Sequence, residues 1–333
     1  MKRILAILID LLLGAAVGAL LARVIVPALL DITLSPDITS ALYAAMAGAA
    51  VFAIVGRFRN ASIGGVSLGI DTPEGSSMRV VSHLGWLTLS VFIVGGWIIT
   101  AISPIEFFSG DGLAGAGRIF QALVTPEFDI IGEAVSAMVV TIFTAFMATV
   151  VAVPISFLLS FPAARNVMSD TPLKKSIYVG LRVILNIMRS MEPIIWAIIF
   201  SVWVGIGPFA GMPALVVHTV ASLTKQYSEQ IEDVNSGPIE AISATGASRI
   251  QVLWFAIVPQ CIIPFLSFTI YRWDINVRMA TIIGFVGGGG IGTLLTQYQG
   301  LAKYNEVGTL VILITAVVWI LDVVSARVRE ALR

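Results

Sequence analysis

Charged residues are scarce in this sequence, and cysteine is nearly absent. Asp, Glu, Lys and Arg make up 12% of the 333 residues, whereas soluble domains usually carry about 25%. The 20 basic and 20 acidic residues balance, so no electrostatic attraction to nucleic acid is indicated and we expect no nucleic-acid partner. The single cysteine, Cys261, excludes a disulfide framework within the chain, and we interpret it as a buried, inert thiol.

Apolar residues are abundant instead. Hydrophobic residues make up 57% of the chain, and the mean hydropathy is +0.95. Eight runs approach the length of about 20 residues that a helix needs to cross a bilayer; they lie at 4–30, 39–56, 84–103, 132–161, 177–204, 208–225, 260–284 and 307–326. We therefore predict an all-α, polytopic bundle of about eight transmembrane helices.

The basic residues of the connecting segments predict the orientation. Lys2 and Arg3 place the N-terminus in the cytoplasm by the positive-inside rule, and an even number of spans returns the arginine-rich C-terminus to the same side. The predicted outer loops, 31–38 and 104–131, are mostly acidic. We expect a multi-pass protein of the plasma or inner membrane, surrounded by lipid, with both termini in the cytoplasm.

The stretch EAISATGASRIQVLWFAIVP, residues 240–259, is polar and lies between two apolar runs on the predicted cytoplasmic side. Gly237 as N-cap, Pro238 at the first helical position and Glu240 near the positive end predict a short helix. Gly246 is expected to end this helix.

A second short helix is predicted directly after that glycine. Ser248 stands three residues before Gln251, which is the spacing of a capping box. Small residues gather at the turn between the two helices, where they would allow the backbone of another protein to come close; they are Ala241, Ala244, Gly246 and Ala247. The alternative interpretation is an ordinary cytoplasmic loop.

The same stretch resembles the EAA loop of ABC importer permeases, whose pattern is E-A-A, three residues, G, nine residues and I-x-L-P. Glu240, Ala241, Gly246 and Pro259 fall in register, whereas Ile242 replaces the third-place alanine. Further motifs follow the order of the phosphonate-type branch of this family: ARN at 164–166, RSMEP at 189–193, GPFAG at 207–211, YRWDINVR at 271–278 and GFVGGGGIG at 284–292. The resemblance covers residues 132–330 strongly and 84–131 only by topology.

The resemblance implies a type I (MetI-like) permease core that works as a homodimer. Two cytoplasmic ABC ATPase subunits would bind ATP and magnesium, and an extracytoplasmic solute-binding protein would deliver a small phosphorus oxyanion such as a phosphonate, phosphite or phosphate. The chain has no Walker A motif, so we expect it to bind no cofactor and to be no enzyme. The residues expected to couple it to the ATPase are Glu240, Ala241, Gly246, Ala247, Ser248 and Pro259.

The predicted domain organisation is simple. Residues 1–83 form an N-terminal extension with two transmembrane helices and a Gly/Ser-rich cytoplasmic linker at 64–77. Residues 84–333 form the permease core, and residues 226–259 are its cytoplasmic coupling loop.

Ionisable residues within the predicted spans are costly in lipid and indicate function by default. On the helix containing YRWDINVR, Arg272 and Asn276 share a face, and Asp274 and Arg278 form an (i, i+4) pair. We take these residues, with Arg189 and Glu192, as candidates for the substrate pathway, because guanidinium groups suit phosphorus oxyanions. Alternatively, the charges only hold helices together.

Two other features of the predicted spans have simpler interpretations. His218 is expected to make a hydrogen bond between helices, and no metal site or catalytic group is predicted. The run Gly287, Gly288, Gly289 and Gly290 lacks the strand and the GK[ST] ending of a nucleotide-binding loop. We expect it to form a gate or a sharp turn at the outer end of the seventh span, or to approach a symmetry mate.

Other functions stay open from the sequence alone. The chain could be an ATP-independent secondary carrier that uses the buried charges for ion coupling, an ABC permease for a different small solute, or a membrane protein that binds partners without transport.

Overall fold

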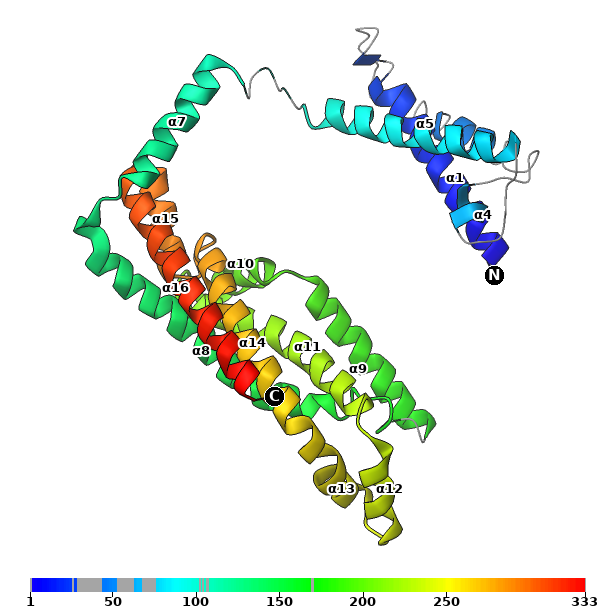
Figure 1. Cartoon of the computed structure of the whole chain (residues 1–333), viewed down its shortest axis with the longest axis vertical. Helices are drawn as coiled ribbons and strands as arrows, with labels where there is room; N and C mark the ends of the chain where they lie inside the picture. Colours follow the sequence, from blue (N-terminus) through cyan, green and yellow to red (C-terminus); the bar gives the residue numbers. More distant parts are fainter. Residues whose placement is uncertain are drawn as a thin grey trace. The chain divides into compact units, whose positions relative to one another are not determined.

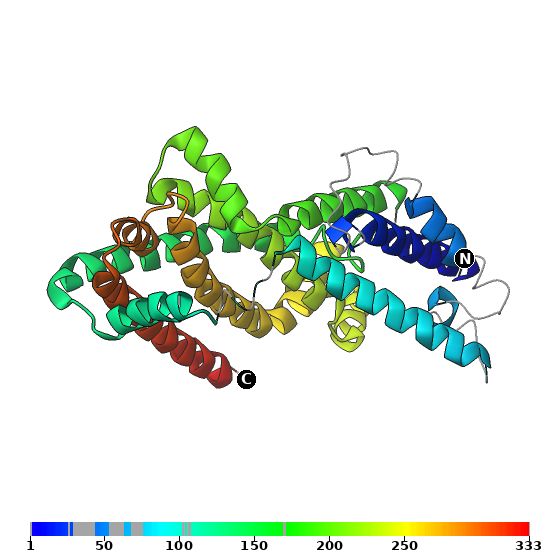
Figure 2. The ribbon, with the colours of Figure 1, turned by 90° about the horizontal axis from the view of Figure 1, so that it is seen from above.

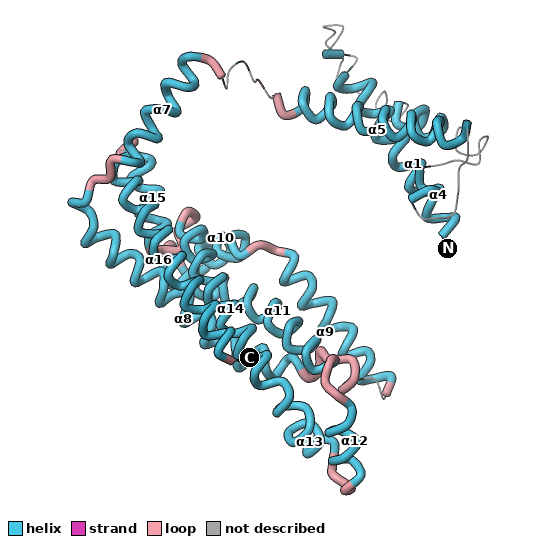
Figure 3. The backbone as a smooth tube through the Cα atoms, in the orientation of Figure 1, coloured by secondary structure: helices cyan, strands magenta, loops and turns pink. Residues whose placement is uncertain are grey.

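The computed structural model describes residues 2–25, 27–28, 44–52, 63–67, 76–101, 103, 105, 108–168 and 171–332. All regular structure in these residues is helical (Figure 3), so the predicted all-α class is confirmed for them. The chain divides into two compact units, residues 1–113 and residues 114–333, and each is described by itself.

The first unit is built on α1 (Lys2–Leu20), which continues into a π-helical turn, η1 (Leu21–Ile25). Helix α1 packs closely against the helical segment 44–52, because a Cβ atom added at Gly14 or Gly18 would overlap the backbone there. Small residues at intervals of four allow such approach of membrane helices. This unit also contains the helices α4 (Ile63–Ser67) and α5 (Ser76–Ile99).

This unit includes α5, which the sequence assigns to the permease core. Helix α5 packs against α1 and η1, and Val91 shares a small apolar core with Val17, Ile25 and Phe52. The functional boundary at residue 83 stays a prediction. Most of the predicted linker at 64–77 lies outside the described residues.

The second unit holds the longer helices (Figure 1). It begins within α7 (Gly110–Val124) and continues with a single 3-10 turn, η2 (Phe128–Ile130), that leads into α8 (Ile131–Ser160). Next come α9 (Pro172–Ser190), α10 (Pro193–Val204) and α11 (Pro208–Glu232). The C-terminal part contains α14 (Val258–Gly284), α15 (Ile291–Gly300) and α16 (Tyr304–Ala331).

Helices α8, α11 and α14 pack against one another and form the centre of this unit, and α16 covers α14 and α15 (Figures 1 and 2). The shared core contains many small residues, among them Ala134, Ala145, Ala148, Ala214 and Ala280. Small side chains let helix backbones approach closely where lipid removes the usual hydrophobic driving force.

Helices α9 and α10 meet at an angle of 88°, so the predicted span at 177–204 is broken into two helices. Pro193 is the first residue of α10. A residue before proline avoids the helical region, and Glu192 is accordingly extended, with φ −63° and ψ 147°. We call the bend at residues 190–193 the elbow.

The predicted count of eight spans is not confirmed. Five helices among the described residues are long and apolar enough to cross a membrane, and the bent pair α9–α10 would be a sixth. The predicted span at 39–56 is described only at 44–52. Helix α11, predicted as a span at 208–225, reaches Glu232 and carries polar residues along its second half, which explains why it is not among these five.

Candidate functional site

Helix α12 (Ser236–Ala244) is the first part of the predicted coupling loop. Its N-cap is Asn235, not Gly237 as the sequence suggested. The Asn235 N–H donates to Oε1 of Gln260 at 3.1 Å, so a side chain from α14 fixes where α12 begins. The sequence could not reveal this contact, because the two residues are 25 positions apart.

Gly246 ends α12 as predicted. Its φ is +80°, in the left-handed region that favours glycine, and its N–H donates to the Ser243 carbonyl at 3.0 Å. Ser248 then caps α13 (Arg249–Val252), and the capping box with Gln251 is complete, including a 2.7 Å bond from the Ser248 N–H to Oε1 of Gln251. This part of the sequence prediction is confirmed.

The second half of the coupling loop is not a separate short helix, and this corrects the prediction of two short helices. Helix α13 continues through a π-helical turn, η3 (Leu253–Ile257), directly into α14. The result is one helix of 36 residues from Arg249 to Gly284. Proline normally removes a hydrogen bond and breaks a helix, but here Pro259 follows a wider turn in which the Val258 N–H bonds to the Leu253 carbonyl.

The residues predicted to contact an ATPase subunit are accessible in the second unit. Glu240, Ala241, Gly246, Ser248 and Pro259 are exposed, and Ala247 is half-buried. The space beside Gly246 is open to the backbone of a partner, since a Cβ atom at Gly246 would meet nothing within 4 Å.

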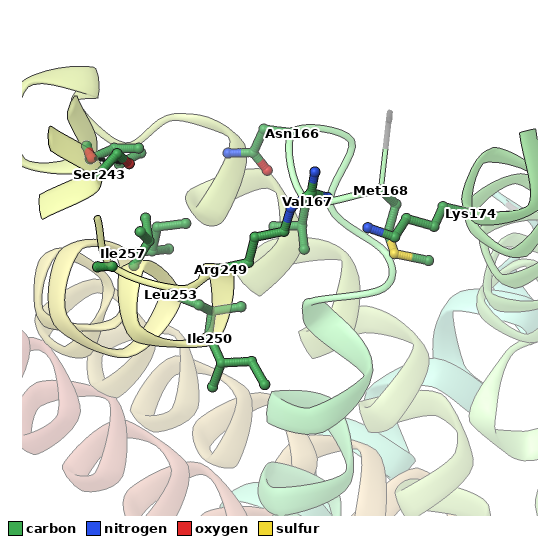
Figure 4. Close-up of a pocket in the computed structure, with 12 residues that line it drawn as sticks. Asn166, Val167, Met168, Lys174, Ser243, Arg249, Ile250, Leu253 and Ile257 are labelled. Atoms are coloured by element: carbon green, nitrogen blue, oxygen red, sulfur yellow. Dashed lines mark hydrogen bonds between the residues drawn. The ribbon is translucent and has the colours of Figure 1, made fainter. Parts of the chain in front are cut away.

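We call the helical segment formed by α12, α13 and η3 the coupling segment. A cavity of about 570 Å³ lies between it and the turn that follows α8 (Figure 4). Ile239 and Ser243 of α12 line one side, and Arg249 extends from α13 toward the turn at Asn166 and Val167. Nδ2 of Asn166 donates to the Ile231 carbonyl at 2.7 Å. The ARN motif therefore ties the turn to the end of α11, just before the coupling segment.

The charged residues of α14 separate into two groups. Asp274 pairs with Arg278 as predicted, and Asp274 is buried while the Arg278 side chain is 43% exposed. This pair lies close enough to Asp322 and Arg329 of α16 to interact with their charges. Arg272 is 8% exposed, and its Nε has no hydrogen-bond partner among the described residues.

The elbow brings together three of the candidate pathway residues. His218 of α11 lies with Nδ1 3.3 Å from the Met191 carbonyl; the predicted hydrogen bond is present, but its partner lies in the elbow and not within a helix. Arg189, Glu192 and Arg272 are all close enough to His218 to act on its charge. No ion pair joins Arg189 to Glu192 within the described part of the chain, because α9 ends at Ser190 and the chain turns away before Glu192.

Asn276 is occupied by contacts within the core. Its Oδ1 accepts from Thr219 of α11 at 3.0 Å, and its Nδ2 donates to Thr149 of α8 at 2.9 Å. Asn276 is 1% exposed, so this amide joins the three central helices. Its predicted contribution to a substrate pathway stays untested by this arrangement.

Replacing Asn276 with Ala should destabilise the protein, because the change leaves two buried hydroxyl groups without this partner. An unsatisfied buried polar group costs about 1–3 kcal/mol. The control is Asn305→Ala, which removes solvent-accessible bonds to Thr125 from a half-buried residue and should cost less. Thermal unfolding in detergent measures both variants, and equal losses would contradict the structural role assigned to Asn276.

The glycine run forms the turn between α14 and α15, which confirms the predicted sharp turn. Gly287, Gly289 and Gly290 have φ values of +90°, +75° and +73°. The run approaches the GPFAG segment of its own chain: the Gly207 N–H donates to the Gly287 carbonyl at 2.8 Å, and a Cβ at Gly211 would lie 2.9 Å from the Gly288 oxygen. A gating role stays a prediction.

Comparisons with known proteins agree with this architecture. The family model described as "Binding-protein-dependent transport system inner membrane component" matches residues 156–333. The phosphite transport system permease protein PtxC of Stutzerimonas stutzeri is 32% identical over 255 residues, which cover 74% of this chain and 90% of that protein. The phosphate-import permease protein PhnE of Mycolicibacterium smegmatis is 30% identical over 240 residues, covering 72% of this chain and 44% of that protein.

Solved structures show the same fold. A chain of the MetNI methionine ABC transporter in an inward-facing conformation aligns with a TM-score of 0.50 at 22% identity, covering 61% of this chain and 96% of that chain. A chain of an amino acid ABC transporter with histidines gives a TM-score of 0.51 at 17% identity, covering 62% of this chain and 97% of that chain. At these identities the likeness concerns the fold alone.

Proposed function

Because this chain belongs to the family of binding-protein-dependent transport system inner membrane components, we propose that it is the permease subunit of an ABC importer for a small phosphorus oxyanion. The observation that carries the proposal is the similarity to the phosphite permease PtxC, which extends over 90% of that protein's length. Phosphite, phosphate and a phosphonate are the solutes to test.

The elbow offers a physical reason for an anionic solute. Arg272 is almost fully buried with an unpartnered Nε, and it lies near enough to Arg189 for the two positive charges to interact. Burying a cation costs free energy unless an anion or a hydrogen-bond acceptor compensates its charge. A passing oxyanion would supply that compensation, and the planar guanidinium presents paired donors that match its oxygens.

In this proposal, ATP hydrolysis on other subunits supplies the energy for transport. Two cytoplasmic ATPase subunits would bind ATP and magnesium and dock on α12, and a solute-binding protein would deliver the oxyanion from the other side. A second copy of this chain would complete the membrane-spanning part. The exposed residues of α12 and the capped turn after it support docking at this position.

Uptake of radiolabelled phosphite by proteoliposomes that contain the whole transporter tests the proposal. We expect uptake that requires ATP and the binding protein. Uptake without ATP would indicate a secondary carrier instead, and uptake of only an unrelated solute would show that the substrate assignment is wrong.

Arg272→Gln should preserve assembly but reduce oxyanion uptake at least about tenfold, because it removes the charge and keeps a polar side chain of similar length. A tenfold change corresponds to about 1.4 kcal/mol. Arg327→Gln, at an exposed position of α16, is the matched control. If Arg272→Gln melts early but transports normally per folded molecule, Arg272 is structural and lies outside the pathway.

A further inference from the structure

A second cavity lies between α9 and α11; it has a volume of about 350 Å³ and is lined mainly by charged and polar side chains. Arg182, Asn186 and Arg189 recur at intervals of four and three residues and so share one face of α9. Lys225, Ser228 and Glu229 face them from α11. We call this space the α9–α11 cavity; it adjoins the elbow, which begins one residue after the lining residue Arg189.

The cavity wall carries more positive than negative charge. Arg182 pairs with Glu232 at 2.7 Å, where each side chain is 29% exposed. Lys225 lies 3.5 Å from Glu229, and both side chains are more open to solvent; such exposed pairs contribute little energy and exchange partners easily. Arg189 has no ion pair among the described residues. Three cations therefore face two carboxylates.

We propose that the α9–α11 cavity binds a phosphorus oxyanion from the cytoplasmic side and acts as an exit-side site that slows the transporter when the internal solute is abundant. The proposal rests on the function proposed above for its choice of ligand. Arg189 offers paired donors, Lys225 offers a point charge, and the Asn186 amide adds neutral donors. Glu229 also lines the cavity and opposes the anion, but the cations outnumber the carboxylates by one, so the net charge favours binding.

Arg182 connects this cavity to the coupling segment. Its Nε donates to the Ala163 carbonyl at 3.1 Å, and its Nη2 donates to Oε1 of Glu232. The same carboxylate oxygen accepts from the Arg165 N–H at 2.7 Å. Glu232 is the last residue of α11, and α12 begins at Ser236. The carboxylate thus joins α9, the turn after α8 and the start of the coupling segment.

An anion in the cavity would compete with Glu232 and Glu229 for the cations on its wall. An anion held by Arg189 and Lys225 that also accepts from Arg182 draws this guanidinium away from Glu232, so occupancy favours the state in which the Arg182–Glu232 contact is weakened. A ligand shifts an equilibrium only by its difference in affinity for the two states. Internal oxyanion should therefore reduce ATP hydrolysis that depends on the coupling segment.

The first test measures binding of phosphite to the detergent-purified complex of permease and ATPase subunits without the solute-binding protein. Phosphite is the probe because phosphate is itself a product of ATP hydrolysis. Calorimetry at constant ionic strength, with chloride as the comparison anion, should show saturable binding. Lys225→Gln and Arg189→Gln should each weaken it about tenfold, and Arg327→Gln should leave it unchanged.

The second test measures ADP release by the same complex in proteoliposomes with phosphite on the ATPase side. Phosphite should inhibit the wild-type protein, and Lys225→Gln should remove most of that inhibition. The inference is overturned if phosphite does not bind, if it binds equally to wild type and both cavity variants, or if inhibition persists in Lys225→Gln.

The same preparations separate this inference from the proposed function. Normal ATP-dependent uptake of phosphite without cavity binding would leave the proposed function intact and remove the exit-side site. Cavity binding that both substitutions weaken, in a transporter that takes up no phosphorus oxyanion, would support the site and contradict the proposed substrate.

Discussion

Gly292→Ala is expected to destabilise the second unit strongly and to lower the yield of folded protein. Gly292 lies in the first turn of α15, where a Cβ atom would overlap the Thr281 carbonyl oxygen and lie 2.9 Å from the Gly284 Cα. Both obstacles are backbone atoms of α14 and cannot rotate away. Overpacking of a tight core costs about 1–3 kcal/mol and sometimes more, and a rigid backbone obstacle places this change at the upper end.

The yield of monodisperse protein in detergent and its thermal unfolding midpoint measure this effect. Gly300→Ala is the matched control, since it lies in the same helix with nothing within 4 Å of its Cβ position. Gly290→Ala should resemble Gly292→Ala, because it combines a φ of +73° with a clash against Thr141. Wild-type stability of Gly292→Ala would show that α15 does not pack against α14 in this way.

Ala241→Arg is expected to abolish solute-stimulated ATP hydrolysis while the permease still folds. Ala241 is exposed in the middle of α12, where a long side chain causes no internal clash and arginine is a good helix former. A bulky charge on the surface that an ATPase subunit is proposed to cover would block close approach. Recovery of the ATPase subunit with tagged permease and the rate of ATP hydrolysis are the measurements.

Gly246 is a less suitable position for this test, although it stands at the same turn. Its φ of +80° makes any side chain there strained whatever the free space, so a loss of docking could follow from a distorted turn. Ser77→Arg, in the first unit near the predicted cytoplasmic side, is the matched control. Normal recovery and hydrolysis with Ala241→Arg would exclude α12 as the docking surface.

Local features of the coupling segment could be predicted from the sequence because their partners are close along the chain. The capping box needs only Ser248 and Gln251, and the glycine turn needs only the conformation of Gly246. The continuous helix through Pro259 could not be predicted, because proline usually ends a helix and a π-helical turn has no clear sequence signal.

The division of the charged stretch YRWDINVR into two faces was predicted from helical spacing, and the structure confirms it. Residues two positions apart on a helix point in different directions, so Arg272 lies toward the elbow while Asp274 and Arg278 lie near α16. The sequence YRWDINVR shows which residues share a helix face, but it does not show which other helices or turns lie beside each face. Nothing in the sequence near Asn276 indicated its bonds to Thr149 and Thr219, which come from helices 127 and 57 residues away.

The unbroken helix from Arg249 to Gly284 can act as a mechanical lever. Its 36 residues correspond to about 54 Å at 1.5 Å per residue. Helices α8 and α11 hold its middle and serve as the fulcrum. If the rod tilts by about 10° around that point, geometry moves each end by about 5 Å in opposite directions. A push on the turn beside α12 would therefore displace the glycine turn at the other end, and the π-helical turn η3 and Pro264 are the points along the helix where bending would absorb part of the movement.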